Sequence, residues 1–215
     1  MLTPLMIKLG GSLIHHENGE ILRRLGSSIS QLSTQVPFLI VPGGGPFADT
    51  VRRYGKQLHL SEETCHFMAL TAMDQYAFLV KEFIPPSILT DLSSTPSLAD
   101  LPITREPQIL LCARFLSQIS SDRLPRSWDV TSDSLAAYLA GQLNPSLLII
   151  LKSTDIDPRL AEPDLDPFIR HLLPLKMPVW FLNGLYPDRL ARLIQTGTTQ
   201  GVYLPSHALS ARIIP

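Results

Sequence analysis

The sequence has no long apolar run, no excess of charge of one sign and no targeting segment at its amino terminus. No apolar run approaches the roughly 18 residues of a membrane-spanning helix, so we expect none. The 18 Lys and Arg are balanced by 19 Asp and Glu, so the composition has nothing that attracts nucleic acid or an anionic membrane. A short apolar start interrupted by Lys8 is not a signal peptide. We therefore expect a cytoplasmic protein whose partners are neither nucleic acids nor membranes.

Cysteine and histidine are too scattered to form a disulfide framework or a metal cluster. Cys65 and Cys112 have apolar surroundings, and we interpret both as reduced core residues. His15 and His16 fall in a polar stretch, whereas His66 falls within a predicted helix, where it is placed to line a pocket. We expect no metal ion to be bound directly by protein side chains.

Both common phosphate-binding motifs are also missing, because neither G-x-x-x-x-G-K-[ST] nor G-x-G-x-x-G occurs. The chain has instead two glycine turns, MIKLGGSL at 6–13 and IVPGGGPFAD at 40–49. Each ends a short apolar run and leads into a helix-like segment. A strand that feeds a glycine turn and then a helix start forms an anion site, because free N–H groups converge there. With Lys8 beside the first turn, the pattern predicts phosphoryl transfer.

The two turns differ in how strongly they indicate a bound ligand. Gly10 and Gly11 alone are more often an ordinary tight turn, but Lys8 at the end of a buried strand favours a ligand, because an unpaired buried ammonium is costly. The run from Gly43 to Gly45 favours a ligand more strongly, since a simple turn rarely needs more than one glycine. Asp49 either stabilises the first turn of its helix or faces the ligand.

Short apolar runs alternate with segments of helical periodicity, which predicts an α/β fold with a mostly parallel sheet and ligands at the carboxyl ends of the strands. We expect one domain over 1–215, with the Pro- and Ser-rich stretch 85–107 as its loop-rich internal boundary. The predicted strands are 5–9, 38–41, 87–90, 108–112, 147–151, 179–182 and, at the edge of the sheet, 201–204. The predicted helices are 20–33, 47–58, 61–83, 132–143 and 187–195.

Polar residues gather where these predicted elements begin or end. Asp133 opens a helix, where an acid stabilises the helix dipole or orients lysine ammonium groups. Lys152 follows the most apolar strand. Asp155 and Asp157 either hold Mg²⁺ or the nucleotide, or are ordinary loop acids. Asn183-Gly184 either starts a helix or borders the nucleotide.

Five segments, in this order, resemble the amino acid kinase superfamily of acetylglutamate, aspartate, uridylate and isopentenyl phosphate kinases: IKLGGSL, IVPGGGPFAD, VTSDSLAAYLA, LIILKSTDID and FLNG. The resemblance extends over nearly the whole chain. It implies a three-layer αβα sandwich, ATP with Mg²⁺ as the phosphoryl donor, a small phosphorylated molecule as the acceptor, and a homo-oligomer. The apolar helix around 67–79 is a plausible dimer face.

The resemblance also implies roles for individual residues. Lys8 would stabilise the phosphoryl in transfer, Asp133 would organise the catalytic lysine and Lys152 would lie near the ATP phosphates. Such a set suits phosphoryl transfer, which depends on positioning and charge neutralisation. The residues implied at the ATP phosphates are Gly10, Gly11, Ser12, Ser153, Thr154, Asp155, Asp157, Asn183 and Gly184. Those implied at the acceptor are Gly43, Gly44, Gly45, Asp49, His66, Asp74, Thr131 and Ser132.

HFMALTAMDQYAFL, GGGPFAD and SWDVTSDSLAA look most like a narrower subgroup, the kinases that convert [5-(aminomethyl)furan-3-yl]methyl phosphate to its diphosphate in methanofuran-type cofactor synthesis. Isopentenyl phosphate kinases carry GGGSFGH, with a phosphate-binding histidine where this chain has Asp49. Because a carboxylate repels phosphate and attracts an amine, we expect Asp49 or Asp74 to pair with the acceptor's amine. The alternatives are another acceptor (a carboxylate, isopentenyl phosphate or a nucleoside monophosphate) or a non-catalytic homologue that binds nucleotide or oxyanion.

Two further features depart from the superfamily pattern. The lysine that follows a Gly-Gly-Met-type turn in acetylglutamate kinases has no counterpart near Asn183. The segment TGTTQGVYL lacks the usual Gly-Thr pair of the last turn.

Overall fold

In the computed structural model, which describes residues 3–157, 168–205 and 212–214, eight strands form one sheet in the order β3-β4-β2-β1-β5-β6-β7-β8. Neighbouring strands from β3 to β6 are parallel, whereas the β6–β7 and β7–β8 pairs are antiparallel. The strands are β1 (Leu5–Leu9), β2 (Phe38–Pro42), β3 (Ile88–Asp91), β4 (Gln108–Leu111), β5 (Leu147–Lys152), β6 (Val179–Asn183), β7 (Gly201–Leu204) and β8 (Arg212–Ile214).

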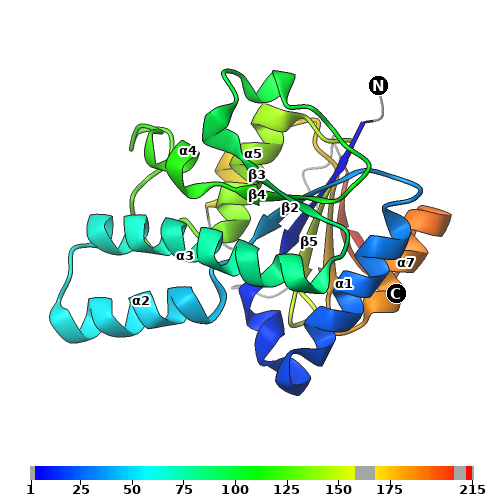
Figure 1. Ribbon diagram of the computed structural model, residues 1–215, viewed down its shortest axis with the longest axis horizontal. Helices are drawn as coiled ribbons and strands as arrows, with labels where there is room; N and C mark the ends of the chain where they lie inside the picture. The colour runs from blue at the N-terminus through cyan, green and yellow to red at the C-terminus, as the bar shows by residue number, and fades with distance from the viewer. Residues whose placement is uncertain (1–2, 158–167, 206–211, 215) are drawn as a thin grey trace.

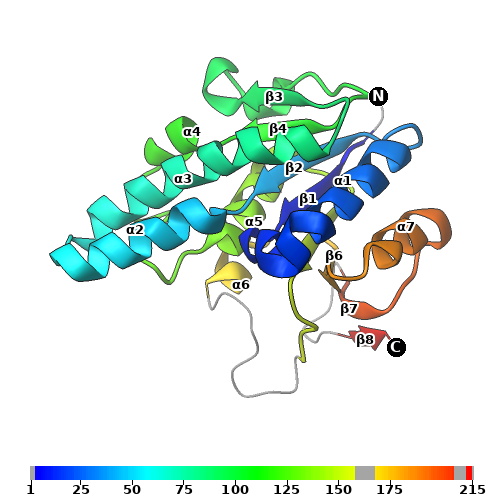
Figure 2. The same ribbon diagram turned by 60° about the horizontal axis from the view of Figure 1, so that its bottom comes forward.

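Helices cover both faces of the sheet, which gives the three layers expected (Figures 1 and 2). The α-helices are α1 (Glu20–Leu32), α2 (Gly45–Leu58), α3 (Glu62–Phe83), α4 (Ala113–Ser117), α5 (Ser132–Leu143), α6 (Ile169–Leu172) and α7 (Pro187–Thr196). The 3-10 helices are η1 (Gly11–Gly19), η2 (Leu92–Ser94) and η3 (Leu98–Asp100). Helices α1 and α7 pack together on one face and α5 and α6 on the other. Helices α2 and α3 lie side by side and extend beyond the sheet (Figure 2).

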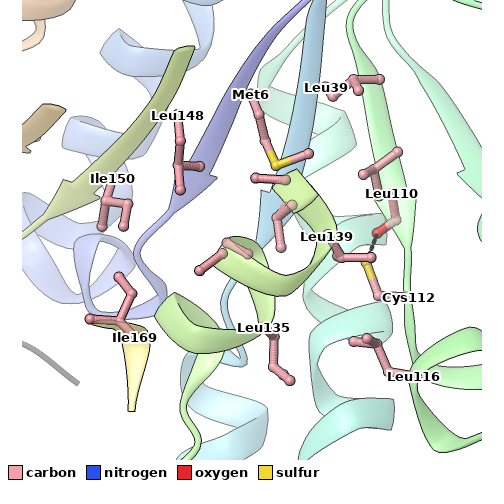
Figure 3. Packing of buried hydrophobic residues seen from close by; sticks show 14 of the residues in the cluster. Met6, Leu39, Leu110, Cys112, Leu116, Leu135, Leu139, Leu148, Ile150 and Ile169 are labelled. Carbon is pink, nitrogen blue, oxygen red and sulfur yellow. Dashed lines mark hydrogen bonds between the residues drawn. The ribbon is translucent and has the colours of Figure 1, made fainter. Parts of the chain in front are cut away.

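The alternation of side chains along the central strands decides which residues face α5. Met6 of β1 and Leu148 of β5 belong to the buried cluster around α5 (Figure 3), whereas Ile7 and Ile149 belong to the cluster under α1. Successive side chains of a strand point to opposite faces. Lys8 and Lys152 therefore continue the α5-facing rows of their strands, at the carboxyl end of each.

Helix α5 is buried along most of its length, because small side chains let it lie close to the sheet. Ala136, Ala137 and Ala140 are fully buried, and Leu135 and Leu139 fill the space toward β4 and α4 (Figure 3). The side chain of Thr131 accepts a hydrogen bond from the N–H of Asp133 and caps the helix. The cap fixes where the first turn of α5 begins, and this turn carries Asp133.

Most predicted elements are confirmed to within a few residues, but three features differ. The prediction that 201–204 is an edge strand is wrong, because β8 pairs along its outer side; a strand of three residues is too short to leave a recognisable pattern. Helices η1, α4 and α6 were not predicted. The stretch after β3, predicted to be rich in loops, contains two 3-10 turns, η2 and η3. Cys65 and Cys112 are buried and free, as predicted.

Two expectations about membranes and self-association can be compared with the structure. Within the described residues, no helix is both long and apolar enough to cross a membrane. Helix α3 exposes Met68 and Phe78, which are 37% and 57% accessible, on the side turned away from the core. That this face joins two copies of the chain stays a prediction.

Candidate active site

Two lysines from neighbouring strands meet one aspartate at the carboxyl edge of the sheet. The Nζ of Lys8 lies 2.6 Å from Oδ1 of Asp133, and the Nζ of Lys152 lies 3.1 Å from Oδ2 of the same carboxylate. Only 6% of the Lys8 side chain, 3% of the Asp133 side chain and 16% of the Lys152 side chain is exposed. Strands β1 and β5 and the amino end of α5 thus bring together all three residues predicted to be catalytic.

The electrostatics of this triad favour an anion. Burial raises the pKa of the Asp133 carboxyl, but the charges and hydrogen bonds of Lys8 and Lys152 outweigh burial and hold that pKa below its usual value. The carboxylate is therefore ionised, and the three groups together carry one net positive charge. Two ammonium groups held at this edge of the sheet attract anions, and the phosphate groups of a substrate are such anions.

The two glycine turns lie against each other beside the triad. The N–H of Gly10 donates to the carbonyl of Leu151 over 3.0 Å, and the N–H of Gly43 donates to the carbonyl of Leu9 over 2.8 Å. A Cβ on Gly11 would lie 2.3 Å from the backbone nitrogen of Gly45, so no other residue fits there. The close contact between the turns therefore explains why Gly11 must be a glycine. A bound ligand, which the sequence predicts, is a second explanation for the glycines of both turns.

The loop after β5 is tied to the loops on both sides of it. The hydroxyl of Ser12, in the first glycine turn, donates to Oγ of Ser153 over 3.0 Å. The N–H of Gly184, after β6, donates to the carbonyl of Lys152 over 2.7 Å. Residues predicted to contact the ATP phosphates thus form one connected rim of loops at the carboxyl edge of the sheet.

Asn183 and Asp155 form the outer part of this rim. The Nδ2 of Asn183 donates to Asp155 over 3.0 Å, and its Oδ1 accepts the N–H of Leu185 over 3.0 Å. Arg189 of α7 pairs with the other oxygen of Asp155. Burial raises the pKa of Asp155, but the hydrogen bonds from Asn183 and Arg189 outweigh it, so the pKa is lowered. Asn183 therefore both initiates the turn and positions Asp155.

A narrow pocket of about 60 Å³ opens beside the second glycine turn, between α2, α3 and the loop that precedes α5. Four of the residues predicted for the acceptor, Gly44, His66, Thr131 and Ser132, line it. Burial and the nearby Arg126 charge lower the pKa of His66, against a hydrogen bond to the Ser127 backbone that raises it. The imidazole is therefore neutral at pH 7.

A model of the amino acid kinase family matches residues 4–161, a segment that contains both glycine turns and the whole triad. The chain belongs to the amino acid kinase family. Membership implies a kinase that uses ATP.

Relatives of this kinase include [5-(aminomethyl)furan-3-yl]methyl phosphate kinase from Methanocaldococcus jannaschii, which is 26% identical over 212 residues covering 88% of this chain and 92% of the relative. Among solved structures, uridylate kinase from Archaeoglobus fulgidus matches with a TM-score of 0.64 and 17% identity over 90% of this chain and 96% of that one. UMP kinase from Ureaplasma parvum matches with a TM-score of 0.66 and 14% identity over 94% and 98% of the two chains. UMP kinase from Bacillus anthracis matches with a TM-score of 0.69 and 12% identity over 99% of each chain. At these identities, the structural matches show the fold.

Two acids predicted to pair with the acceptor's amine lie outside the lining of this kinase's pocket. Asp49 is half exposed and pairs with Arg52 at 2.9 Å and with His15 at 3.3 Å. Asp74 accepts the N–H groups of Cys112 and Ala113 over 2.7 and 3.1 Å, and so holds the end of β4 against α3. Both acids have structural partners, and their pairing with an amine stays a prediction.

Three residues of the kinase's site were not predicted. Arg52 and Trp128 line the pocket, with the guanidinium of Arg52 5.0 Å from the centre of the Trp128 ring. Arg189 holds Asp155 and lies over the ring of Tyr186 at 4.3 Å. The one signal for Arg52 is its place one helical turn after Asp49. Trp128 falls in an aperiodic loop and gives no signal.

The described part of this kinase holds no set of side chains arranged to bind a metal ion. Over the described ranges, no group of three or more His, Cys, Asp or Glu side chains is placed to hold one. Asp155, a candidate ligand in the sequence, is engaged by Asn183 and Arg189. We therefore derive no step through a metal ion bound directly by the protein.

Proposed function

We propose that this kinase transfers the γ-phosphoryl group of ATP to the phosphate of a small molecule. The acceptor that we propose is [5-(aminomethyl)furan-3-yl]methyl phosphate, which becomes its diphosphate in methanofuran-type cofactor synthesis. The observation that carries the proposal is the buried triad of Lys8, Asp133 and Lys152 beside two glycine turns in contact. The acceptor is supported by the similarity to the Methanocaldococcus jannaschii enzyme and by the sequence segments of that subgroup.

The proposed chemistry needs charge neutralisation more than it needs a base. A phosphate oxygen of the acceptor attacks the γ-phosphorus, the bond to the oxygen that bridges the β and γ phosphorus atoms breaks, and ADP leaves with that electron pair. The attacking oxygen is already deprotonated near neutral pH. Lys8 and Lys152 offset the charge that spreads over the transferring group, and Asp133 holds both ammonium groups in place.

Mg²⁺ would enter this reaction as part of the nucleotide substrate, held by the phosphates of ATP. Activity is then expected to follow the concentration of the Mg²⁺–ATP complex and to stop when a chelator removes Mg²⁺. Binding of Mg²⁺ to the protein in the absence of nucleotide, measured by calorimetry, would contradict this part of the proposal.

The size of the pocket supports a small acceptor. Pockets for drug-sized ligands measure about 300–1,000 Å³, whereas the space beside Gly44 is about 60 Å³. Leu70, Met73 and Leu135 give it an apolar wall. This wall can pack against an apolar ring such as furan.

The proposal is tested by supplying ATP with [5-(aminomethyl)furan-3-yl]methyl phosphate, isopentenyl phosphate, UMP or a carboxylate such as N-acetylglutamate. ADP release and the mass of the product are followed. We expect diphosphate formation with the highest kcat/KM on the furan acceptor. A clear preference for another acceptor would overturn the substrate assignment. ATP binding without turnover on any of the four would overturn the kinase function and indicate a nucleotide-binding homologue.

A further inference from the structure

Within the part of the chain that the structure describes, Arg52 of α2 is the one residue of the acceptor-pocket lining with a permanent charge. None of the described lining residues is a carboxylate. Asp49, which pairs with Arg52, lies outside the lining. A group that enters this pocket therefore meets a guanidinium and no acid, which favours an anionic group over a cationic one.

Two neighbours hold the guanidinium of Arg52. Its Cζ lies 5.0 Å from the centre of the Trp128 ring, and its Nη1 donates to Oδ1 of Asp49 over 2.9 Å. A guanidinium has five N–H donors in one plane, and the bond to Asp49 uses one of them. The others suit a phosphate, whose oxygens accept two parallel hydrogen bonds from one guanidinium. Because these neighbours restrict the side chain before a ligand arrives, the entropic cost of binding is lower.

Two helices begin at the same pocket. Gly44 is the N-cap of α2 and Thr131 is the N-cap of α5, and both residues line the pocket. Over the described residues, no side chain caps α2 and no acid lies in its first turn. The start of a helix carries a partial positive charge, because its first N–H groups have no partner within the helix. Both helix starts therefore add to the attraction of an anion.

The pocket adjoins the triad. Ser132 lines the pocket, and the next residue, Asp133, pairs with both lysines. Because the pocket measures about 60 Å³, a phosphate bound to Arg52 also lies close to Ser132. Such a phosphate is then next to the ammonium groups assigned to the transferring phosphoryl. The proposed reaction requires the acceptor's phosphate to lie there, because one of its oxygens attacks the γ-phosphorus.

We propose that Arg52 is a specificity-determining residue, whose guanidinium binds the phosphate group of the acceptor. This inference rests on the proposed function and deepens it, because it assigns the recognition of that phosphate to one side chain. Hydrogen bonds between charged groups are the stronger kind, so the contact distinguishes a phosphate from a neutral hydroxyl group. The contact exists before transfer as well as during it. Its loss should therefore raise KM for the acceptor more than it lowers kcat.

The first test compares the kinetics of two matched variants. Arg52→Met keeps an unbranched side chain and removes the charge. Arg53→Met makes the same change at the next residue, an exposed arginine that lies over the Tyr54 ring and does not line the pocket. We expect KM for the furan acceptor to rise about 10–100-fold in Arg52→Met and to stay near the wild-type value in Arg53→Met.

The other kinetic constants show whether Arg52 acts through binding. In Arg52→Met, kcat and KM for ATP should change by less than about threefold. Arg52→Lys, which keeps the charge and loses the planar fork of donors, should have a KM for the acceptor between those of the wild type and Arg52→Met. An unchanged KM in Arg52→Met, or equal rises in Arg52→Met and Arg53→Met, would overturn the inference.

The second test measures recognition of the phosphate without catalysis. Calorimetry with ADP in place of ATP compares [5-(aminomethyl)furan-3-yl]methyl phosphate with [5-(aminomethyl)furan-3-yl]methanol, which lacks the phosphate. The ratio of the two dissociation constants cancels the contacts of the ring and the amine. We expect the wild type and Arg53→Met to bind the phosphate about 100-fold more tightly, and Arg52→Met to reduce that ratio by about tenfold or more.

The outcomes separate this inference from the proposed function. A ratio that is undiminished in Arg52→Met, or a wild type that binds the two molecules equally, would overturn the inference. If the wild type nevertheless converts the furan phosphate to its diphosphate, the kinase function stands. No turnover of the furan phosphate by the wild type would overturn both the substrate assignment and the inference.

Discussion

The two sides of the site are built from different parts of the chain. The side assigned to phosphoryl transfer consists of strand ends, the first glycine turn, whose backbone contacts the second, and a buried ion triad. The side assigned to the acceptor consists of long side chains on α2, α3 and the loop before α5. There, Arg52 lies over Trp128 at 5.0 Å and Arg126 lies over Phe67 at 4.9 Å.

This difference implies that one set of residues carries out phosphoryl transfer and another set selects the acceptor. Groups on the central strands are fixed by the sheet, so the charges at the phosphoryl group keep one geometry. Side chains on a helix pair and a loop can change without disturbing the sheet. Substitutions in the triad should therefore impair catalysis or folding, whereas substitutions at the pocket should change KM and acceptor preference.

The largest effect on stability is expected when one substitution removes the carboxylate that pairs with both lysines. Replacing Asp133 with Asn removes the buried carboxylate that Lys8 and Lys152 share, which should lower the free energy of unfolding at pH 7 by roughly 3–5 kcal/mol. Because the folded-state pKa of Asp133 is lowered, its contribution is complete above the ordinary carboxyl pKa and is lost as the pH falls through the folded-state value. Urea unfolding of both proteins from pH 7 to pH 3 measures this. The gap between them should narrow at acid pH; a gap independent of pH would contradict the ion triad.

The next effect concerns catalysis alone. Replacing Lys8 with Met keeps an unbranched side chain of similar length and removes the charge. Because one positive charge at the transferring phosphoryl is lost, kcat should fall by about 10²–10³-fold. Initial rates of ADP release under saturating substrates measure this. Lys176→Met, which alters an exposed lysine, is the matched control. A fall of less than about tenfold would argue against a role for Lys8 in the transition state.

Most of the fold could be predicted from the sequence, because the strands and helices have distinct hydrophobic periods. The two lysines were also predictable, since each continues a row of buried residues at a strand end, Met6 before Lys8 and Ile150 before Lys152. Their pairing with one aspartate was not predictable. It depends on where α5 lies across the sheet, and small residues such as Ala136 set that position.

The residues that line the acceptor pocket were harder to predict than the strands and helices. Its lining comes from α2, α3 and an aperiodic loop, so no stretch of sequence contains it. Helix α3 and strands β3 and β4 separate Arg52 from Trp128 in the sequence, and the two residues meet only because α2 and this loop flank α3. The acid at position 49 stood out in the sequence because it differs from a family pattern. In the structure, that acid has partners of its own.

A smaller effect, confined to the acceptor, is expected at Trp128. Replacing Trp128 with Ala removes one wall of the pocket and the partner of Arg52, so KM for the furan acceptor should rise by about tenfold while KM for ATP changes little. Steady-state kinetics with each substrate varied in turn measure this. The sequence has two tryptophans, so Trp180→Phe leaves Trp128 as the only indole. Its fluorescence should respond to the acceptor in that variant, and an unchanged spectrum would argue against the pocket.

The smallest effect is expected at Asp49, and it tests whether this carboxylate recognises the acceptor's amine. Its side chain is 54% exposed and its partners Arg52 and His15 are also about half exposed, so the ion pairs are screened by water. Replacing Asp49 with Asn should change the free energy of unfolding by less than about 1 kcal/mol and KM for the furan acceptor by less than about fivefold. KM is then compared with that for (5-methylfuran-3-yl)methyl phosphate, which lacks the amino group. If KM rises tenfold for the aminomethyl acceptor and not for this analogue, the carboxylate of Asp49 binds the amine.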